Sequence, residues 1–224
     1  DYHIHPSYSL DAHDVSILAY CYRALELGLK EICFTPHLEL DPVRRQIDWF
    51  VRWNGRIHPM QDYRWLDAYF REIEAAQNEF ADSGLIIRAG LEVGFDRGLE
   101  EKIAAVVNAY PFDYVLGSVH CVEHRAISNY QESSNYFPYR RLEVVVNNYF
   151  ITLFEAAASG LFDCLGHLDL YRRYGILYYG PEVNNAHQRY LPELFKLMRQ
   201  QKLGLEINTS GRRRGLNDFH PTEE

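Results

Sequence analysis

Histidine and carboxylate residues occur in this sequence at spacings that suit metal binding. His3 and His5 lie two residues apart in a segment expected to be a strand. Both imidazoles therefore point to the same side while Ile4 points away. Asp11 follows His5 by six residues, close enough for a loop to return its carboxylate to the same ion. Imidazole and carboxylate ligands without thiolate suit zinc, manganese or iron.

Further metal-capable side chains stand at the ends of other expected strands. They are His37 just after the second strand, Glu92 on the third, His120 on the fourth and His167 on the fifth. In β/α barrels the carboxyl ends of the strands converge on one mouth, where the chemistry takes place. We therefore expect these side chains to form one metal centre. The carboxylate of Glu92 is suited to bridging two cations.

Hydroxyl and guanidinium groups follow two of these strands and suit a phosphate ligand. Two cations about 3.5–4 Å apart are a common device for phosphoryl chemistry. Ser210 and Arg212 come after the sixth expected strand, and Arg173 comes shortly after the fifth. Arginine can hold phosphate with two parallel hydrogen bonds. For the two arginines that follow Arg212, a solvated surface is an equally good interpretation.

The elements that must position these residues alternate along the chain. Strands are expected at 2–5, 31–35, 85–93, 112–119, 162–166 and 203–208, and helices at 14–27, 63–80, 139–159 and 189–201. We expect Asp14 to cap the first helix, Gly28 to end it, and Gly204 to end the last one. The alternation predicts a parallel sheet with helical crossovers, either doubly wound or closed into a barrel. The segment 41–60 is expected to be a long loop.

Bulk composition narrows the class of protein. The 224 residues, 47% of them apolar, suffice for one large domain or two small ones. The net charge of -8 argues against a nucleic-acid partner. Four scattered cysteines, no signal peptide and no apolar run of membrane-spanning length predict a reduced cytoplasmic protein. Trp49 and Trp53 in the expected loop could cover a site or pack against the domain.

Seven segments together resemble the PHP superfamily of metal-dependent phosphoesterases. They are DYHIH at 1–5, YSLD at 8–11, TPH at 35–37, GLEV at 90–93, GSVH at 117–120, GHLD at 166–169 and EINTSG at 206–211. The resemblance spans the chain in order and implies a single domain over 1–224 with a distorted (β/α)7 TIM-like barrel fold. It also implies two or three divalent ions of zinc, iron or manganese. The ligands implied are His3, His5, Asp11, His37, Glu92, His120 and His167, with Glu92 bridging.

Within this superfamily the motifs most resemble the histidinol-phosphate phosphatases. The resemblance implies that a metal-bridging hydroxide attacks phosphorus in line, without a covalent intermediate or another assigned catalytic residue. It also implies that Arg212, Arg173 and Ser210 hold the phosphate. Alternatives are a phosphoesterase for a nucleotide, sugar phosphate or phosphotyrosine, or a degenerate metal-binding module. An oligomer is possible.

One family motif, Gly-Ser-Asp-x-His on a seventh strand, is not found. The sequence begins inside a strand-like stretch, and 221–224 has the pattern of a helix start. We therefore expect the last β/α unit to be missing from an incomplete sequence.

Overall fold

A computed structural model describes residues 1–222 of the chain. These residues form two compact units, of which the first contains 1–93 and 102–116. The second contains 94–101 and the described residues from 117 onward. The helix start expected at 221–224 includes two residues outside the described part. Three elements, β5, α3 and β6, contain residues of both units.

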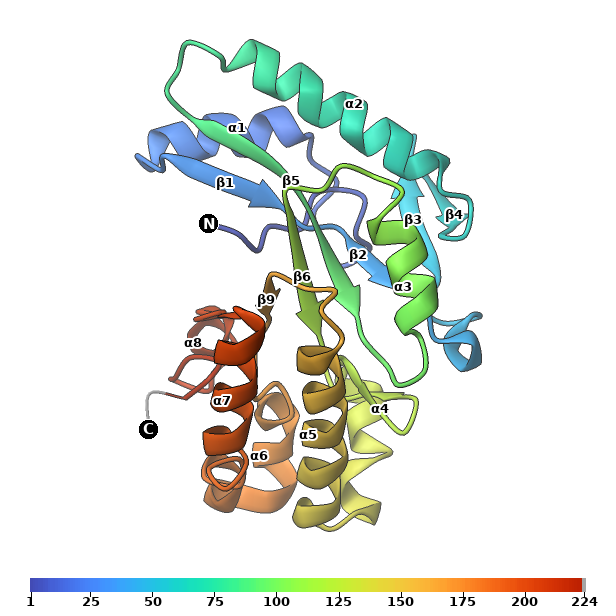
Figure 1. Ribbon diagram of the computed structural model, residues 1–224, viewed down its shortest axis with the longest axis vertical. Helices are drawn as coiled ribbons and strands as arrows, with labels where there is room; N and C mark the ends of the chain where they lie inside the picture. Colours follow the sequence, from blue (N-terminus) through green and yellow to red (C-terminus); the bar gives the residue numbers. More distant parts are fainter. Residues whose placement is uncertain (223–224) are drawn as a thin grey trace. The chain divides into compact units, whose positions relative to one another are not determined.

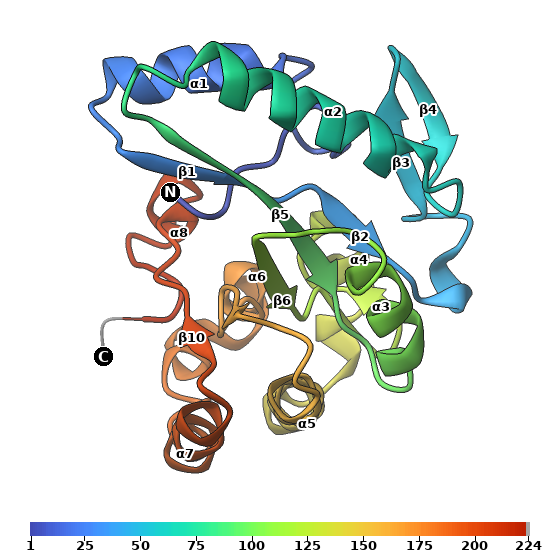
Figure 2. The same cartoon turned by 45° about the horizontal axis from the view of Figure 1, so that its top comes forward.

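The first unit alternates helices with short strands. In chain order its elements are α1 (Ile17–Glu26), β1 (Glu31–Phe34), β2 (His37–Glu39), η1 (Pro42–Arg44), β3 (Phe50–Trp53), β4 (Arg56–Pro59), α2 (Arg64–Glu79), β5 (Ile86–Gly94), α3 (Glu100–Val107) and β6 (Tyr114–Ser118). Figures 1 and 2 show α1 and α2 side by side along β1 and β5.

The second unit is mainly helical. Its elements are β7 (Cys121–Val122), β8 (Arg125–Ala126), α4 (Tyr130–Ser134), η2 (Phe137–Tyr139), α5 (Leu142–Ala158), β9 (Cys164–Leu165), α6 (Arg172–Tyr179), η3 (Gly180–Asn184), α7 (Leu191–Gln201), β10 (Gly204–Leu205) and α8 (Ser210–Arg213). Helices α5 and α7 pack together (Figure 1). Phe150 and Tyr190 stack at this contact, with ring centroids 4.6 Å apart.

The sheet is parallel, as the alternation of elements predicts. Strand β1 pairs in parallel with β5, and β9 pairs in parallel with β10. Within the first unit the strand order is β1-β5-β6, and β2 also pairs with β5; within the second it continues β6-β9-β10. The strand expected at 2–5 is reduced to one parallel bridge, between Ile4 and Phe34. This bridge still aligns the chain before Ile4 with β1.

The helix expected at 63–80 is confirmed as α2, and its apolar face is buried. Trp65, Tyr69 and Ile73 are at most 2% exposed. The hydroxyl of Tyr69 donates to the carbonyl of Phe34, 2.8 Å away, and lies 3.0 Å from the backbone nitrogen of Gly90. A helix side chain thus ties β1 to β5 beside the point where Glu92 will emerge.

Two expected helix ends are wrong. Ser16 rather than Asp14 caps α1, because the Ser16 backbone is extended and its hydroxyl accepts from the nitrogen of Ala19. Helix α7 ends at Gln201 and is capped by Lys202, which adopts a left-handed φ of 55°, while Gly204 already belongs to β10. At both ends, a residue closer to the helix than the expected one satisfies the terminal backbone groups.

The expectation of a long loop at 41–60 is also wrong. After η1, strands β3 and β4 form an antiparallel hairpin that pairs Phe50 with Pro59 and Trp53 with Arg56. Asn54 and Gly55 make its two-residue turn with φ of 50° and 68°. An Asn-Gly pair favours this conformation in hairpins, so a local signal for the hairpin was present in the sequence.

All four cysteines, Cys21, Cys33, Cys121 and Cys164, are free and buried. No helix within residues 1–222 is long and apolar enough to cross a membrane.

Candidate metal centre

The carboxylate of Glu92 stands at the centre of a histidine cluster in the first unit. Glu92 is fully buried near the end of β5. Its Oε2 atom lies 3.3 Å from Nε2 of His3, 3.0 Å from Nε2 of His5 and 3.1 Å from Nδ1 of His37. The side chains of the three histidines are 13%, 21% and 22% exposed, so the cluster remains open to solvent on the histidine side.

The backbone explains why these three histidines converge. His3 and His5 flank Ile4, whose bridge to Phe34 sets the segment alongside β1, and both imidazoles turn to the same side. Their Nε2 atoms are 3.0 Å apart. His37 begins β2, which pairs with β5 beside Glu92. Hence two separate segments deliver three nitrogens to the same carboxylate oxygen, two from the chain around Ile4 and one from β2.

Asp11 joins this cluster from the loop before α1. Its two carboxylate oxygens lie 3.1 and 3.0 Å from Nδ1 of His5. One of them is also 3.6 Å from Nε2 of His37. A carboxylate on the far nitrogen of a ligand histidine fixes the ring's orientation and tautomer. Asp11 is therefore placed either to orient His5 or to share a second ion with His37.

The electrostatics of the cluster couple the histidines to the carboxylates. Burial lowers the pKa of His5, but hydrogen bonds to Asp11 and Glu92 outweigh burial and raise the pKa to about 9. Desolvation raises the pKa of Asp11, yet its hydrogen bonds with His37 and His5 hold the pKa well below the ordinary value. In the metal-free chain these charges therefore favour a proton on His5 at neutral pH.

The donor atoms fit a divalent ion. Ligand atoms that each lie about 2.1 Å from a tetrahedral ion are about 3.4 Å apart. The separations around Glu92 are 3.0–3.3 Å, close to that geometry. Within the first unit, two groups of potential ligands meet: His3 with His5 and Glu92, and His5 with Asp11 and His37. All are nitrogen and oxygen donors, which suit zinc, iron or manganese.

The second unit carries the other two predicted ligands as a pair. His120 follows β6 and His167 follows β9, and both are buried. Their ring centroids are 5.3 Å apart. His167 has a φ of 21°, an unusual backbone for a residue other than glycine. Its backbone nitrogen donates to Glu206 at 2.7 Å, and its carbonyl accepts from Tyr149. Such strain persists only where the surroundings enforce it.

The three predicted phosphate-binding residues are only partly brought together. Arg173 donates to the hydroxyl of Ser210 over 3.4 Å, and both side chains are partly exposed. Arg212 is exposed and stacks on Phe219, with its guanidinium 4.0 Å from the ring centroid. The structure thus forms an Arg173–Ser210 pair and turns Arg212 to an aromatic partner.

A buried ion network beside His167 was missed in the sequence. Asp169 accepts hydrogen bonds from Nδ1 of His220 at 2.5 Å and from Arg172 at 2.8 Å. Arg172 also donates to Asp218. The spacing of Asp169 and Arg172 is compatible with one helical turn, but no sequence signal links them to His220, about fifty residues away.

A parallel α/β fold with imidazole and carboxylate donors gathered at strand ends defines a class of proteins suited to a metal centre. Comparison with known families is consistent with this class. The family model of the PHP domain matches residues 1–210. The chain belongs to the PHP domain family.

Two proteins with similar sequences are named as histidinol-phosphatases. A Deinococcus radiodurans protein named "Probable histidinol-phosphatase" is 32% identical over 205 residues, covering 92% of this chain and 71% of that protein. The histidinol-phosphatase of Lactococcus lactis is 29% identical over 212 residues, covering 93% of this chain and 71% of that protein.

Two solved structures share the fold. One is the histidinol phosphate phosphatase of Lactococcus lactis complexed with zinc, L-histidinol and phosphate, with a TM-score of 0.71 and 25% identity. The similarity covers 93% of this chain and 72% of the Lactococcus lactis chain. The other is a Listeria monocytogenes structure with a TM-score of 0.79 and 18% identity. The similarity covers all of this chain and 87% of the Listeria monocytogenes chain. The α/β fold agrees with the distorted TIM-like barrel expected for the family.

Proposed function

We propose that this chain hydrolyses L-histidinol phosphate to L-histidinol and inorganic phosphate at a metal centre. The observation that carries the proposal is the position of Glu92 Oε2, which lies within 3.3 Å of nitrogens from three histidines. The substrate is suggested by the relatives named histidinol-phosphatase and by the similar structure that holds zinc, L-histidinol and phosphate.

The proposed ligands are those expected from the sequence: His3, His5, Asp11, His37, Glu92, His120 and His167. Two or three ions of zinc, iron or manganese are proposed, and the zinc in the similar structure supports the first of these. When bound, such ions lower the pKa of a water molecule and hold the non-bridging oxygens of a phosphate ester.

The side chains of the first unit have defined roles in this proposal. Glu92, with no exposure to solvent, supplies a negative charge shared by three imidazoles. Asp11 accepts a hydrogen bond at Nδ1 of His5 and so leaves Nε2 directed at Glu92 as a donor for an ion. This contact orients the ring before an ion arrives, and it would keep a proton on Nδ1 when an ion takes the place of the proton on Nε2.

For the phosphate we propose Arg173, Ser210 and Arg212. The contact between Arg173 and Ser210 places a guanidinium and a hydroxyl together, a combination that can bind phosphate oxygens. Arg212 is held by its stacking on Phe219, with its guanidinium exposed. A guanidinium that stacks on a ring through its face can form hydrogen bonds through its edge.

We further propose that residues 1–224 form a single PHP domain that works in the cytoplasm on a small phosphate ester. The free, buried cysteines are compatible with a reducing compartment. The net charge of -8 favours a small substrate over a nucleic acid.

The test is phosphate release from L-histidinol phosphate, beside nucleotide, sugar and tyrosine phosphates, after loading with zinc, iron or manganese. We expect preference for L-histidinol phosphate and loss of release in the His3→Ala/His5→Ala variant. His13→Ala, which removes an exposed histidine outside the cluster, is the matched control and should retain activity. Preference for another phosphate ester would contradict the proposed substrate but not the proposed metal centre. Undiminished release by the double variant would reject the centre.

A further inference from the structure

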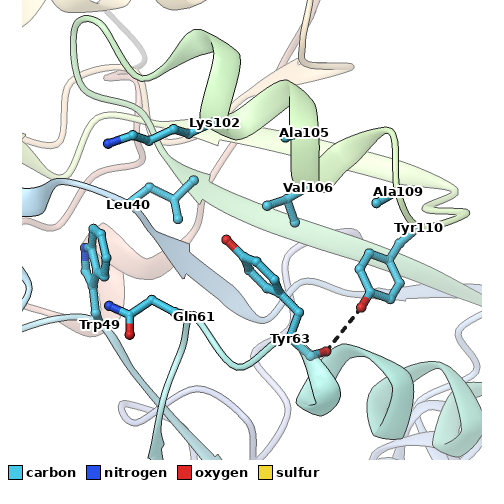
Figure 3. A pocket seen from close by; sticks show the side chains of 9 residues that line it. All are labelled: Leu40, Trp49, Gln61, Tyr63, Lys102, Ala105, Val106, Ala109 and Tyr110. Atoms are coloured by element: carbon cyan, nitrogen blue, oxygen red, sulfur yellow. Dashed lines mark hydrogen bonds between the residues drawn. The ribbon is translucent and has the colours of Figure 1, made fainter.

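A cavity of about 270 Å³ lies in the first unit, lined by residues other than the proposed metal ligands (Figure 3). One wall comes from α3 and the turn after it. Lys102, Ala105, Val106 and Ala109 line it at the spacing i, i+3, i+4 and i+7, so they share one helical face. The small side chains of Ala105 and Ala109 leave the space that larger residues would fill.

The cavity and the histidine cluster are built from different residues. His37, the first residue of β2, contacts Glu92, whereas Leu40, the residue just after β2, lines the cavity. The lining residues do not include His3, His5, Asp11, His37 or Glu92. A ligand in the cavity would therefore contact residues other than those proposed to hold the metal ions.

Polar and aromatic side chains both line the cavity. Figure 3 shows the amine of Lys102, the indole of Trp49 and the amide of Gln61 toward one end. Toward the other end lies Tyr110, whose hydroxyl donates to the carbonyl of Tyr63 over 3.2 Å. The rings of Trp49, Tyr63 and Tyr110 give the cavity three aromatic side chains.

The polar end has unused hydrogen-bonding capacity. Among residues 1–222, the amine of Lys102 and the amide of Gln61 have no hydrogen bond or ion pair. The indole nitrogen of Trp49 is buried and also lacks a hydrogen-bond partner in that part of the chain. A buried donor without a partner is rare and costs free energy, so an acceptor supplied by a ligand would be favoured.

These features specify the chemistry of a ligand. Aromatic walls favour a planar ring, while an ammonium beside two neutral N–H donors favours an anionic acceptor. A cavity of about 150 Å³ is known to hold one benzene molecule, so the volume here suffices for one ring with a short substituent. We propose that this cavity is a binding site for a small aromatic carboxylate, distinct from the metal centre.

The proposal can be tested by titrating the metal-loaded full chain with phenylacetate and with its neutral analogue phenylacetamide, followed by calorimetry. Phenylacetate should bind more tightly than phenylacetamide. Lys102→Met should weaken phenylacetate binding by about fivefold, the upper range for an exposed ion pair, and leave phenylacetamide binding unchanged. Lys30→Met, an exposed lysine of the same unit outside the cavity, is the matched control.

Two further variants separate this site from the metal centre and from general surface binding. Ala105→Leu/Ala109→Leu alters exposed positions and should abolish saturable binding of both probes by filling the cavity. His3→Ala/His5→Ala should bind phenylacetate as the parent chain does. Equal affinity for the two probes, full phenylacetate binding by Lys102→Met or by the filled cavity, or loss of binding in the histidine variant would each overturn the proposal.

Discussion

Nδ1 of His220 lies 2.5 Å from a carboxylate oxygen of Asp169, and both side chains are fully buried. The other oxygen of Asp169 accepts from Arg172 and from the backbone nitrogen of Thr222. Arg172 in turn donates to the carbonyl of Phe219. Through these bonds Asp169, two residues after the strained His167, holds the segment that contains His220.

Replacing Asp169 with Asn should destabilise the fold. The variant removes one of the two carboxylates that pair with the buried Arg172, and breaking a buried ion pair by removing one partner costs about 3 kcal/mol or more. Urea denaturation would measure the change in the free energy of unfolding. Glu26→Gln, which breaks an exposed pair with Arg23, should change it by less than about 0.5 kcal/mol. Equal stability of the two variants would contradict a structural role for the network.

The same carboxylate predicts a loss of stability in acid. Desolvation raises the pKa of Asp169, but His220 and Arg172 outweigh it and lower the pKa below the ordinary value. A carboxylate whose pKa is lowered by folding stabilises the fold at pH values above its pKa in the unfolded chain, which is near 3.8. This contribution is lost as the pH falls through the pKa of the folded chain. The unfolding free energy of the parent chain should therefore drop more steeply than that of Asp169→Asn below about pH 4. Parallel curves would show that Asp169 does not contribute.

Glu92→Gln should weaken metal binding severely. The amide keeps the size of Glu92 but removes the charge that lies beside three imidazoles. Loss of a partner in the outer shell alone commonly costs about 10–100-fold in metal affinity, and a direct ligand should cost at least as much. Zinc competition with a chromophoric chelator would measure the loss. Glu26→Gln should bind zinc as the parent chain does, and equal affinity for Glu92→Gln would exclude Glu92 as a ligand.

Zinc binding should release a proton at neutral pH. Desolvation lowers the pKa of His5, but the carboxylates of Asp11 and Glu92 raise it to about 9, so the metal-free ring is protonated at pH 7.5. An ion must displace that proton, and apparent affinity should rise with pH until about 9. Calorimetry in buffers of different ionisation enthalpy counts the protons, and His5→Ala should release fewer. Heats independent of the buffer would contradict this prediction.

Gly90→Ala should disturb the strand that carries Glu92. An added Cβ would stand 2.5 Å from Sγ of Cys33 and 3.0 Å from the carbonyl oxygen of Phe34. Overpacking of this kind costs about 1–3 kcal/mol and shifts the backbone, so both stability and zinc affinity should fall. Adding Cys33→Ala removes the closer contact and should restore part of both. A double variant no better than Gly90→Ala would show that the clash lies elsewhere.

Arg173→Met should impair hydrolysis if Arg173 holds the phosphate. A hydrogen bond to a charged group contributes about 1.5–3 kcal/mol, which corresponds to a fall in kcat/KM of about tenfold or more. Arg213→Met, which alters an exposed arginine of α8, is the matched control and should be nearly neutral. An equal fall in kcat/KM for Arg213→Met and Arg173→Met would indicate a general effect of positive charge instead of a specific contact with the phosphate.

The local pattern of residues predicted much of the fold. The apolar periodicity of 63–80 predicted α2 within one residue at each end, and the strands at 31–35 and 85–93 were close to β1 and β5. Boundaries failed where two residues could do the same task, as Ser16 did in place of Asp14. The hairpin at 50–59 failed for another reason: its Asn-Gly turn signal was present but was not used.

Residue types and spacing in the sequence alone also predicted the chemical nature of the proposed site. The pair His3 and His5, the position of Glu92 at a strand end and the absence of thiolates were sufficient to predict a nitrogen and oxygen metal centre. These properties depend on neighbours within a few residues, which a strand or a turn places predictably.

Only the tertiary structure decided which atoms meet. It directed Nδ1 of His5 to Asp11 and Nε2 to Glu92, turned Arg212 onto Phe219, and buried Asp169 against His220. These contacts join residues up to 87 positions apart, as in the case of His5 and Glu92. Their partners are set by how strands pair and side chains pack in space, and no local pattern in the chain contains that information.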